Sequence, residues 1–272
     1  MLLFIRQFIR HYLLAIQFFT RIPVTGRLAA WVGYSPSMLR ASAAHFPGVG
    51  VLVGALVAFL TAILLVFLPQ ASPLSPLAAA VLGTVFSVML TGAFHEDGLA
   101  DIADGLGGSQ NRERALEIMK DSRVGAFGAI AVVLVLLTKV ALLAVVGDVN
   151  PEAMVIGIFV AHVASRTFPL LLIRLLPHVG DTAGSKSKPL ADQITDFSLL
   201  IAISWFFIVL AGVYITYDAI DLIVSMVVSS IAFLYMWRLF AHRLQGFTGD
   251  CLGATQQVCE VAFYLGLAFS VA

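Results

Sequence analysis

Three aspartates with a regular spacing follow the second long apolar stretch of the chain. Asp97, Asp101 and Asp104 lie at positions i, i+4 and i+7 within FHEDGLADIADGLGG. On a helix this spacing puts three carboxylates along one stripe, where like charges repel one another. A divalent cation removes the repulsion, and magnesium is commonly held by one or two carboxylates together with substrate phosphates. The spacing therefore favours a metal or phosphate site, with an ordinary solvated loop as the alternative.

Residues suited to phosphate binding come shortly afterwards. In IMKDSRVGAFG, Arg123 offers a planar fork of donors and Lys120 a point charge. Asp121 is either a further metal ligand or a base. His95 is either an interfacial residue at the membrane boundary or a ligand. The glycines among the acids let the backbone approach a ligand, and we expect the helix to end after Gly105.

Polar residues interrupt the apolar remainder in three further places. RLQGFTGDCLGA, residues 243–254, precedes the last apolar stretch and indicates a phosphate or metal loop, with a plain turn as the alternative. Arg166 lies inside an apolar stretch, where an ionisable group is costly and indicates either a functional site or a structural ion pair. Lys139 is in a similar position, and any buried acid would serve as its partner.

The composition is that of a membrane protein. Of the 272 residues, 60% are hydrophobic and 12% are charged, against about 25% charged residues in soluble domains. Lipid is therefore the expected solvent for much of the apolar surface. The net charge of zero argues against a nucleic-acid partner. Cys251 and Cys259 fit neither a zinc signature nor a disulfide framework.

The apolar stretches predict an all-α polytopic membrane bundle of six or seven transmembrane helices, because lipid cannot satisfy open backbone groups. Each stretch is near the ~20 residues that a helix needs to cross the hydrocarbon. The stretches lie at residues 47–68, 74–93, 125–146, 153–173, 197–217, 220–237 and 255–272. The last carries Glu260, and the sequence leaves open whether it spans fully. Residues 1–272 are expected to form one domain, with 1–44 as an N-terminal segment that contains an interfacial helix.

The basic residues predict the orientation. Lys139 and Arg166 lie inside spans, which leaves 14 of the 16 Lys and Arg residues outside them. These fall in the N-terminal segment and in residues 94–124, 174–196 and 238–250. Seven spans put all of these segments on one side, which the positive-inside rule makes cytoplasmic. We therefore expect 94–124 to be an acidic catalytic loop facing the cytoplasm, and the polar stretch 181–196 to be a loop.

These motifs, in order along nearly the whole chain, resemble the cobalamin (5′-phosphate) synthase family, also called adenosylcobinamide-GDP ribazoletransferase. The resemblance rests on FFTRIPV, HFPGVGVLVG, FHEDGLADIADGLGG, IMKDSRVGAFG, the Ser-Arg pair at 165–166 and GFTGDCLGA. Glu96 stands where an apolar residue is expected, and Phe247 where a glycine or polar residue is expected. The 174–196 segment matches least well.

The resemblance implies a magnesium-dependent transferase in the inner membrane of a bacterium. It would join α-ribazole or its 5′-phosphate to adenosylcobinamide-GDP and release GMP, giving adenosylcobalamin or its phosphate. Besides these two substrates and the lipid bilayer, the sequence leaves a homo-oligomer open. The predicted metal ligands are Asp97, Asp101, Asp104 and Asp250. The predicted catalytic residues are Asp104, Asp121 and Arg123. The predicted substrate-binding residues are His95, Lys120, Ser122, Arg166, Thr248 and Gly249.

Two other functions stay open from the residues alone. Asp101-x-x-Asp104-Gly105 resembles the start of the motif of CDP-alcohol phosphotransferases, although the Ala-Arg that should follow two residues later is missing. A transporter would use Arg166 and Lys139 along a pathway. Against a transporter, the acids cluster near one membrane face and the sequence has no apparent inverted repeat.

Overall fold

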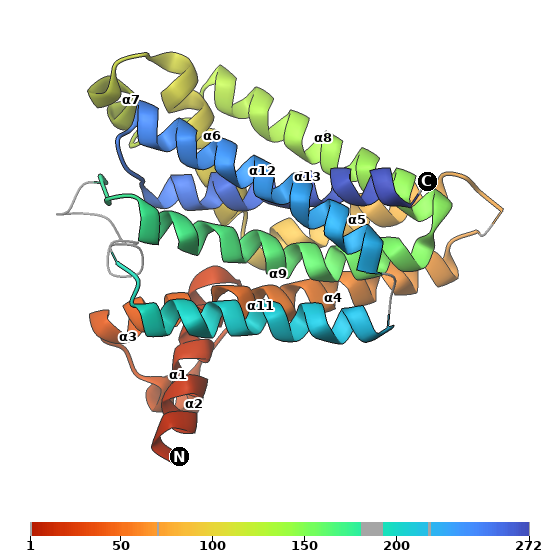
Figure 1. Ribbon diagram of the computed structural model, residues 1–272, viewed down its shortest axis with the longest axis horizontal. Helices are drawn as coiled ribbons and strands as arrows, with labels where there is room; N and C mark the ends of the chain where they lie inside the picture. Colours follow the sequence, from red (N-terminus) through yellow and green to blue (C-terminus); the bar gives the residue numbers. More distant parts are fainter. Residues whose placement is uncertain (1, 70, 181–192, 217–218, 272) are drawn as a thin grey trace.

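The computed structural model describes residues 2–69, 71–180, 193–216 and 219–271, and long helices running along one axis form most of it (Figure 1). Shorter helices gather at one end, on the left of the view. In chain order the elements are α1 (Leu2–Phe19), α2 (Gly26–Val32), α3 (Pro36–Ser42), the 3-10 turn η1 (Ala43–His45), α4 (Phe46–Phe67), α5 (Ser75–Thr91), α6 (Phe94–Gly108), α7 (Arg112–Ile118), α8 (Ala126–Val149), α9 (Pro151–Leu175), α11 (Asp196–Thr216), α12 (Ala219–Arg243) and α13 (Gly249–Ser270).

The prediction of an all-α polytopic membrane protein is confirmed, since a helix covers each predicted span. Among the described residues, five helical stretches are long and apolar enough to cross a membrane, and α5 with α6 forms a sixth candidate that is bent by 89°. The helix α13 falls outside this set because it carries polar residues such as Gln256 and Glu260. It is an inner helix whose side chains are largely buried and which packs against α12, α6 and α9.

The N-terminal helix α1 lies crosswise to the long helices, as expected of a helix in the membrane interface (Figure 1). Its first turns expose apolar side chains such as Leu3 and Phe4, whereas Leu14 and Phe19 near its end are buried in the core. An exposed apolar face on a crosswise helix suits insertion among lipid head groups.

Two glycines set the close packing of α4 on α9. A Cβ on Gly50 would clash with the carbonyl oxygen of His162, and a Cβ on Gly54 would lie 2.8 Å from the carbonyl oxygen of Phe159. This Gly-x-x-x-Gly pair lets two helix backbones approach closely, which is how helices associate where lipid removes the hydrophobic driving force.

A sharp corner between α5 and α6 turns the acidic helix across the end of the bundle. Gly92 (φ 69°) and Ala93 (φ 59°) both adopt the left-handed conformation, which ends α5 and starts α6. A side chain on Gly92 would clash with Arg21, which follows α1. The corner therefore requires glycine both for its backbone conformation and for the docking of the N-terminal segment.

The predicted acidic loop at 94–124 is largely helical, because α6 and α7 cover most of it. The helix α6 continues to Gly108, so the expectation that it ends after Gly105 is wrong. A Cβ on Gly105 would lie 2.9 Å from the carbonyl oxygen of Ala115, so this glycine allows α7 to pack closely on α6. Most of the predicted 181–196 loop lies outside the described residues.

The loops between the helices lie at the two ends of the bundle in the way that the distribution of basic residues predicts. The acidic segment, the start of α13 and the described residues directly after α9 (176–180) and α12 lie at the left end in Figure 1. The loops after α4 and α8, which have no Lys or Arg, lie at the other end. Among the described residues, one end of the bundle thus carries both the acidic motifs and the basic segments.

We expect Gly50→Ala to destabilise the protein by about 1–3 kcal/mol, because the new methyl group would force α4 away from α9. Thermal unfolding in detergent, followed by loss of helical circular dichroism, would measure the change. Gly212→Ala in α11 is the matched control, since a Cβ there meets no atom within 4 Å. Equal melting temperatures for the two variants would contradict the packing role of Gly50.

Candidate active site

Close packing of α6 on α13 brings the two predicted aspartate segments together. A Cβ on Gly98 would lie 2.9 Å from the carbonyl oxygen of Asp250, and a Cβ on Gly253 would lie 3.2 Å from the backbone of His95. The first turn of α13 is therefore in contact with the first turns of α6. Residues about 150 positions apart in the chain share one surface as a result.

Four carboxylates act on one another at this contact. Asp97 is exposed, Asp101 is half-buried and Asp104 is buried, so the predicted stripe leads from solvent into the protein. The charges of Asp97, Asp104 and Asp250 all act on Asp101. Among the described residues, Asp97, Asp101 and Asp250 have no cationic side chain as an ion-pair partner. The repulsion that the spacing predicted is present, and no cationic side chain among the described residues pairs with these three carboxylates.

Asp104 caps the N-terminus of α8. Its Oδ2 accepts a hydrogen bond of 2.7 Å from the backbone N–H of Gly125, and its Oδ1 accepts one of 2.8 Å from that of Gly128. A carboxylate at a helix N-terminus satisfies unpaired N–H groups and interacts favourably with the helix dipole. A Cβ on either glycine would clash with this carboxylate. Asp104 is thus at the site, with both oxygens already engaged.

Asp121 and Arg123 form an exposed ion pair just before α8. The Arg123 Nε donates to Asp121 Oδ1 at 2.9 Å, and this guanidinium lowers the pKa of Asp121 to about 2. The pair lies two residues before Gly125, whose amide binds Asp104. Lys120 and Ser122 are exposed beside it. The predicted phosphate-binding side chains therefore border the carboxylates and face solvent.

Thr248 and Gly249 begin α13. The Thr248 hydroxyl donates to Asp250 Oδ2 at 3.2 Å, which orients that carboxylate in the first turn of the helix. The predicted loop is therefore the N-terminus of a 22-residue helix, where backbone N–H groups and the helix dipole favour an anion.

A buried polar network lies deeper in the bundle and was not predicted as a whole. Its centre is Glu260, which accepts hydrogen bonds from Lys139 Nζ at 2.6 Å, from Gln256 Nε2 at 2.6 Å and from the Tyr264 hydroxyl at 3.1 Å. Lys139 therefore has the buried acid that its position required, and Glu260 faces protein. One signal in the sequence could have indicated this partner, because Glu260 is an acid well inside a predicted apolar stretch.

The same network reaches the first turn of α6. Gln257 Nε2 donates to Gln256 Oε1 at 2.9 Å and to Glu96 Oε1 at 3.0 Å. Glu96, which departs from the expected apolar residue, is buried at this contact. A chain of side chains thus links the ion pair of α8 and α13 to the helix that carries the aspartates.

Arg166 is fully buried beside this network. Its guanidinium donates to the His162 carbonyl oxygen at 3.0 Å, lies 2.9 Å from His162 Nδ1, and stands over the Phe46 ring at 5.7 Å. Its substrate-binding role stays a prediction, because the contacts of the Arg166 guanidinium are with buried protein groups. His95 contacts the same ring from α6, with 5.6 Å between ring centroids.

Two further arginines, which sequence reasoning missed, anchor the acidic segment. Arg243 donates to the carbonyl oxygens of Leu106 at 3.2 Å and Ser109 at 2.7 Å, and Arg112 donates to that of Leu244 at 2.7 Å. These bonds tie the end of α6 and the start of α7 to the end of α12. Hydrogen bonds from a side chain to backbone more than 130 residues away leave no local sequence pattern by which they could be predicted.

The acidic site contains oxygen ligands of the kind that hard cations prefer, but these do not form a metal cage. Among the described residues, no group of three or more His, Cys, Asp or Glu side chains is placed so that it could hold a metal ion. Magnesium does not require such a group, because it keeps waters and binds through one or two carboxylates plus substrate phosphates. Asp97, Asp101 and Asp250 supply oxygen ligands of this kind.

Comparisons with known proteins agree with the motifs. A sequence model described as cobalamin-5-phosphate synthase matches residues 11–268. A protein of Albidiferax ferrireducens named adenosylcobinamide-GDP ribazoletransferase is 67% identical over 96% of this chain and 98% of its own length. Proteins of the same name are 62% identical in a Polaromonas species, over 98% and 99% of the two chains, and 42% identical in Vibrio cholerae, over 93% and 91%. No solved structure matches the chain.

The fold and the site define a polytopic membrane protein with an acidic site at one end of its helical bundle. The chain belongs to the cobalamin-5-phosphate synthase family. The resemblance seen in the motifs is thereby confirmed.

We expect Glu260→Gln to destabilise the protein by about 3–5 kcal/mol, because it leaves the charge of Lys139 buried without its partner. The double variant Lys139→Met with Glu260→Gln should recover much of this loss. Denaturation in mixed micelles would measure both. Glu117→Gln is the control, since Glu117 pairs with Arg114 on the surface at 2.9 Å and should cost less than about 1 kcal/mol. A double variant as unstable as the single one would contradict the pairing.

We expect Asp104→Asn to lower stability by about 1–2 kcal/mol, because the amide nitrogen cannot accept a hydrogen bond from a backbone N–H at the start of α8. Thermal unfolding of the purified protein would measure the loss. Asp148→Asn, an exposed change near the other end of α8, is the control and should change stability by less than about 0.5 kcal/mol. An unchanged melting temperature for Asp104→Asn would rule out the capping role.

Proposed function

We propose that this chain joins α-ribazole or its 5′-phosphate to adenosylcobinamide-GDP and releases GMP. The observation that carries the proposal is the meeting of α6 and α13, where the charges of Asp97, Asp101 and Asp250 act on one another and none of the three has an ion-pair partner among the described residues. A diphosphate substrate needs a site of this kind, because its own charge must be neutralised before a nucleophile attacks. Family membership supplies the identity of the two substrates.

The reaction needs little covalent help from the protein. A ribose hydroxyl of α-ribazole attacks the phosphorus atom that is bonded to cobinamide, and a new P–O bond forms. The bond between this phosphorus and the bridging oxygen breaks, and GMP leaves with that oxygen. The proton of the hydroxyl passes to a carboxylate of the site. Positioning and charge neutralisation provide most of the acceleration in such transfers.

Asp97, Asp101 and Asp250 are the side chains of which one or two, together with the substrate phosphates, would hold magnesium. When bound, the ion would neutralise charge on the diphosphate and on the leaving phosphate. Asp104 caps α8, and its two backbone hydrogen bonds fix its position. It would therefore also hold α6 and the start of α8 in place relative to each other. Arg123 lies at the edge of the site that faces solvent. It would give up some of its hydrogen bonds to Asp121 and bind a substrate phosphate through its planar fork of donors.

We further propose that the site faces the cytoplasm of a bacterial cell, with the chain in the inner membrane. The distribution of Lys and Arg supports this orientation, since the basic segments that the structure describes share the end of the bundle with the acids. Nucleotide-activated substrates are made in the cytoplasm, so a site at this face would receive them directly.

Purified protein in lipid nanodiscs should convert adenosylcobinamide-GDP and α-ribazole, with release of GMP that depends on magnesium. Asp101→Asn should lower kcat by about 100-fold or more, because it removes a carboxylate that would hold the charge-neutralising cation. Chromatography of the corrinoid product would measure turnover. Glu117→Gln, an exposed change on α7, should leave the rate unchanged. Absence of turnover by the wild-type protein under all magnesium concentrations would overturn the proposed function.

A further inference from the structure

The first part of the chain is strongly basic and exposes apolar side chains. Residues 1–45 contain five arginines, and the sequence has no aspartate or glutamate before Glu96. The helices α1 and α2 and the turn after them form what we call the N-terminal platform (residues 2–34). The first turns of α1 extend beyond the long helices and run crosswise to them, on the left of the view (Figure 1).

Two exposed arginines accompany a tryptophan on this platform. The Arg6 guanidinium carbon of α1 lies 6.0 Å from the centre of the Trp31 ring of α2. Arg27 lies four residues before Trp31 and therefore on the same face of α2. Both arginines are exposed, and neither forms an ion pair with an acid among the described residues. Their positive charges are thus available to a partner outside the chain.

Apolar side chains are exposed on the same platform. They include Leu3 and Phe4 of α1, Leu28 and Trp31 of α2, and Tyr34 just after it. At a bilayer surface, side chains of this kind insert among the upper parts of the acyl chains, and tryptophan and tyrosine lie at the level of the head groups. The platform therefore combines the apolar area and the positive charge that together bind a helix to a lipid surface.

The platform has a fixed shape and is fixed to the bundle. Arg10 Nε donates to the Val32 carbonyl oxygen at 2.8 Å, which holds α2 against α1. On another side of α1, the rings of Phe8 and Tyr12 stack on Trp205 of α11, with 6.0 Å and 5.5 Å between ring centroids. The exposed arginines are thus held in one arrangement instead of on a loose N-terminal segment.

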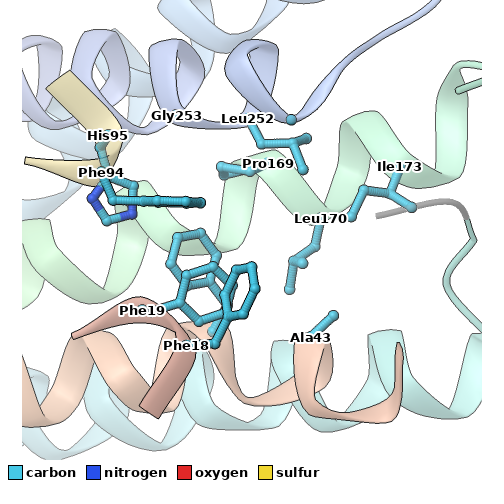
Figure 2. Close-up of a pocket in the computed structure, with 12 residues that line it drawn as sticks. Phe18, Phe19, Ala43, Phe94, His95, Pro169, Leu170, Ile173, Leu252 and Gly253 are labelled. Carbon is cyan, nitrogen blue, oxygen red and sulfur yellow. The ribbon is translucent and has the colours of Figure 1, made fainter. Parts of the chain in front are cut away.

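The far end of α1 packs on the first turn of the acidic helix α6. Phe18 and Phe19 line a narrow apolar pocket together with the start of α6 (Figure 2). The centroid of the Phe94 ring lies 5.7 Å from that of Phe18 and 6.1 Å from that of Phe19. A platform held at the lipid surface therefore also helps to hold the start of α6, next to Asp97.

From these observations we infer that the N-terminal platform binds anionic phospholipid head groups through Arg6, Arg27 and Trp31. The guanidinium groups donate to the lipid phosphate, and the apolar side chains insert beside the acyl chains. A zwitterionic head group fits less well, because the platform has no acid to pair with its positive end. A second copy of the chain also fits less well, because it would bring the same arginines against those of the first.

Quenching of tryptophan fluorescence by brominated lipids tests this inference on the full chain in phosphatidylcholine nanodiscs. The lipids carry bromine near the head-group end of their acyl chains, and the Trp31→Phe variant shows which share of the quenching belongs to Trp31. Brominated phosphatidylglycerol should half-quench Trp31 at a mole fraction about 10-fold lower than brominated phosphatidylcholine. Each arginine near an anionic surface strengthens binding by roughly 5-fold, so two arginines are enough for this preference.

The double variant Arg6→Gln with Arg27→Gln should lose the preference, whereas Arg6→Lys with Arg27→Lys should keep most of it. Arg114→Gln removes a surface arginine of α7 that pairs with Glu117, and this control should leave the preference unchanged. Equal quenching by the two lipids in the wild-type protein would overturn the inference, as would no quenching of Trp31 or a preference that survives in the glutamine variant. The measurement uses no substrate, so its failure is distinguishable from failure of the proposed function.

Discussion

The contact between the starts of α6 and α13 is the constraint on which the site depends. Two glycines, Gly98 and Gly253, allow the backbones of these helices to approach closely enough for Asp250 to act on the aspartates of α6. The approach gathers negative charge and therefore costs free energy unless a cation or a charged ligand compensates it. A protein retains such an arrangement for function, because packing alone would favour neutral side chains.

The rest of the fold holds this contact in place. The corner at Gly92 and Ala93 turns α6 across the bundle, and Arg112 and Arg243 fix its far end to α12. Deeper in the bundle, the Lys139–Glu260 ion pair connects α8 to α13. Gln256 and Gln257 of α13 extend this network to the first turn of α6, where Gln257 donates to Glu96. Buried ion pairs contribute little net stability but tie helices in one arrangement. We interpret this network as the support of the acidic site.

Most of the fold followed from the sequence because spans depend on local composition. Apolar length located the helices, and the spacing of Asp97, Asp101 and Asp104 placed them correctly on one helix. The contact of α6 with α13 did not follow, since it joins residues about 150 positions apart and its glycines carry no signal of their partner. The hydrogen bonds of Asp104 to Gly125 and Gly128 were also unforeseen, since α7 separates the two partners and the sequence does not show how the chain folds back. Gly105 was interpreted as a helix end because a packing glycine and a terminal glycine look identical in a sequence.

The central claim is that the carboxylates of α6 and α13 hold a divalent cation together with the diphosphate substrate. Electron paramagnetic resonance of Mn²⁺, used in place of magnesium, measures this directly in nanodiscs with and without adenosylcobinamide-GDP. The account predicts bound Mn²⁺ that increases when this substrate is present and is lost in Asp101→Asn. Equal Mn²⁺ binding by the wild-type protein and Asp101→Asn, with the substrate present, would contradict it.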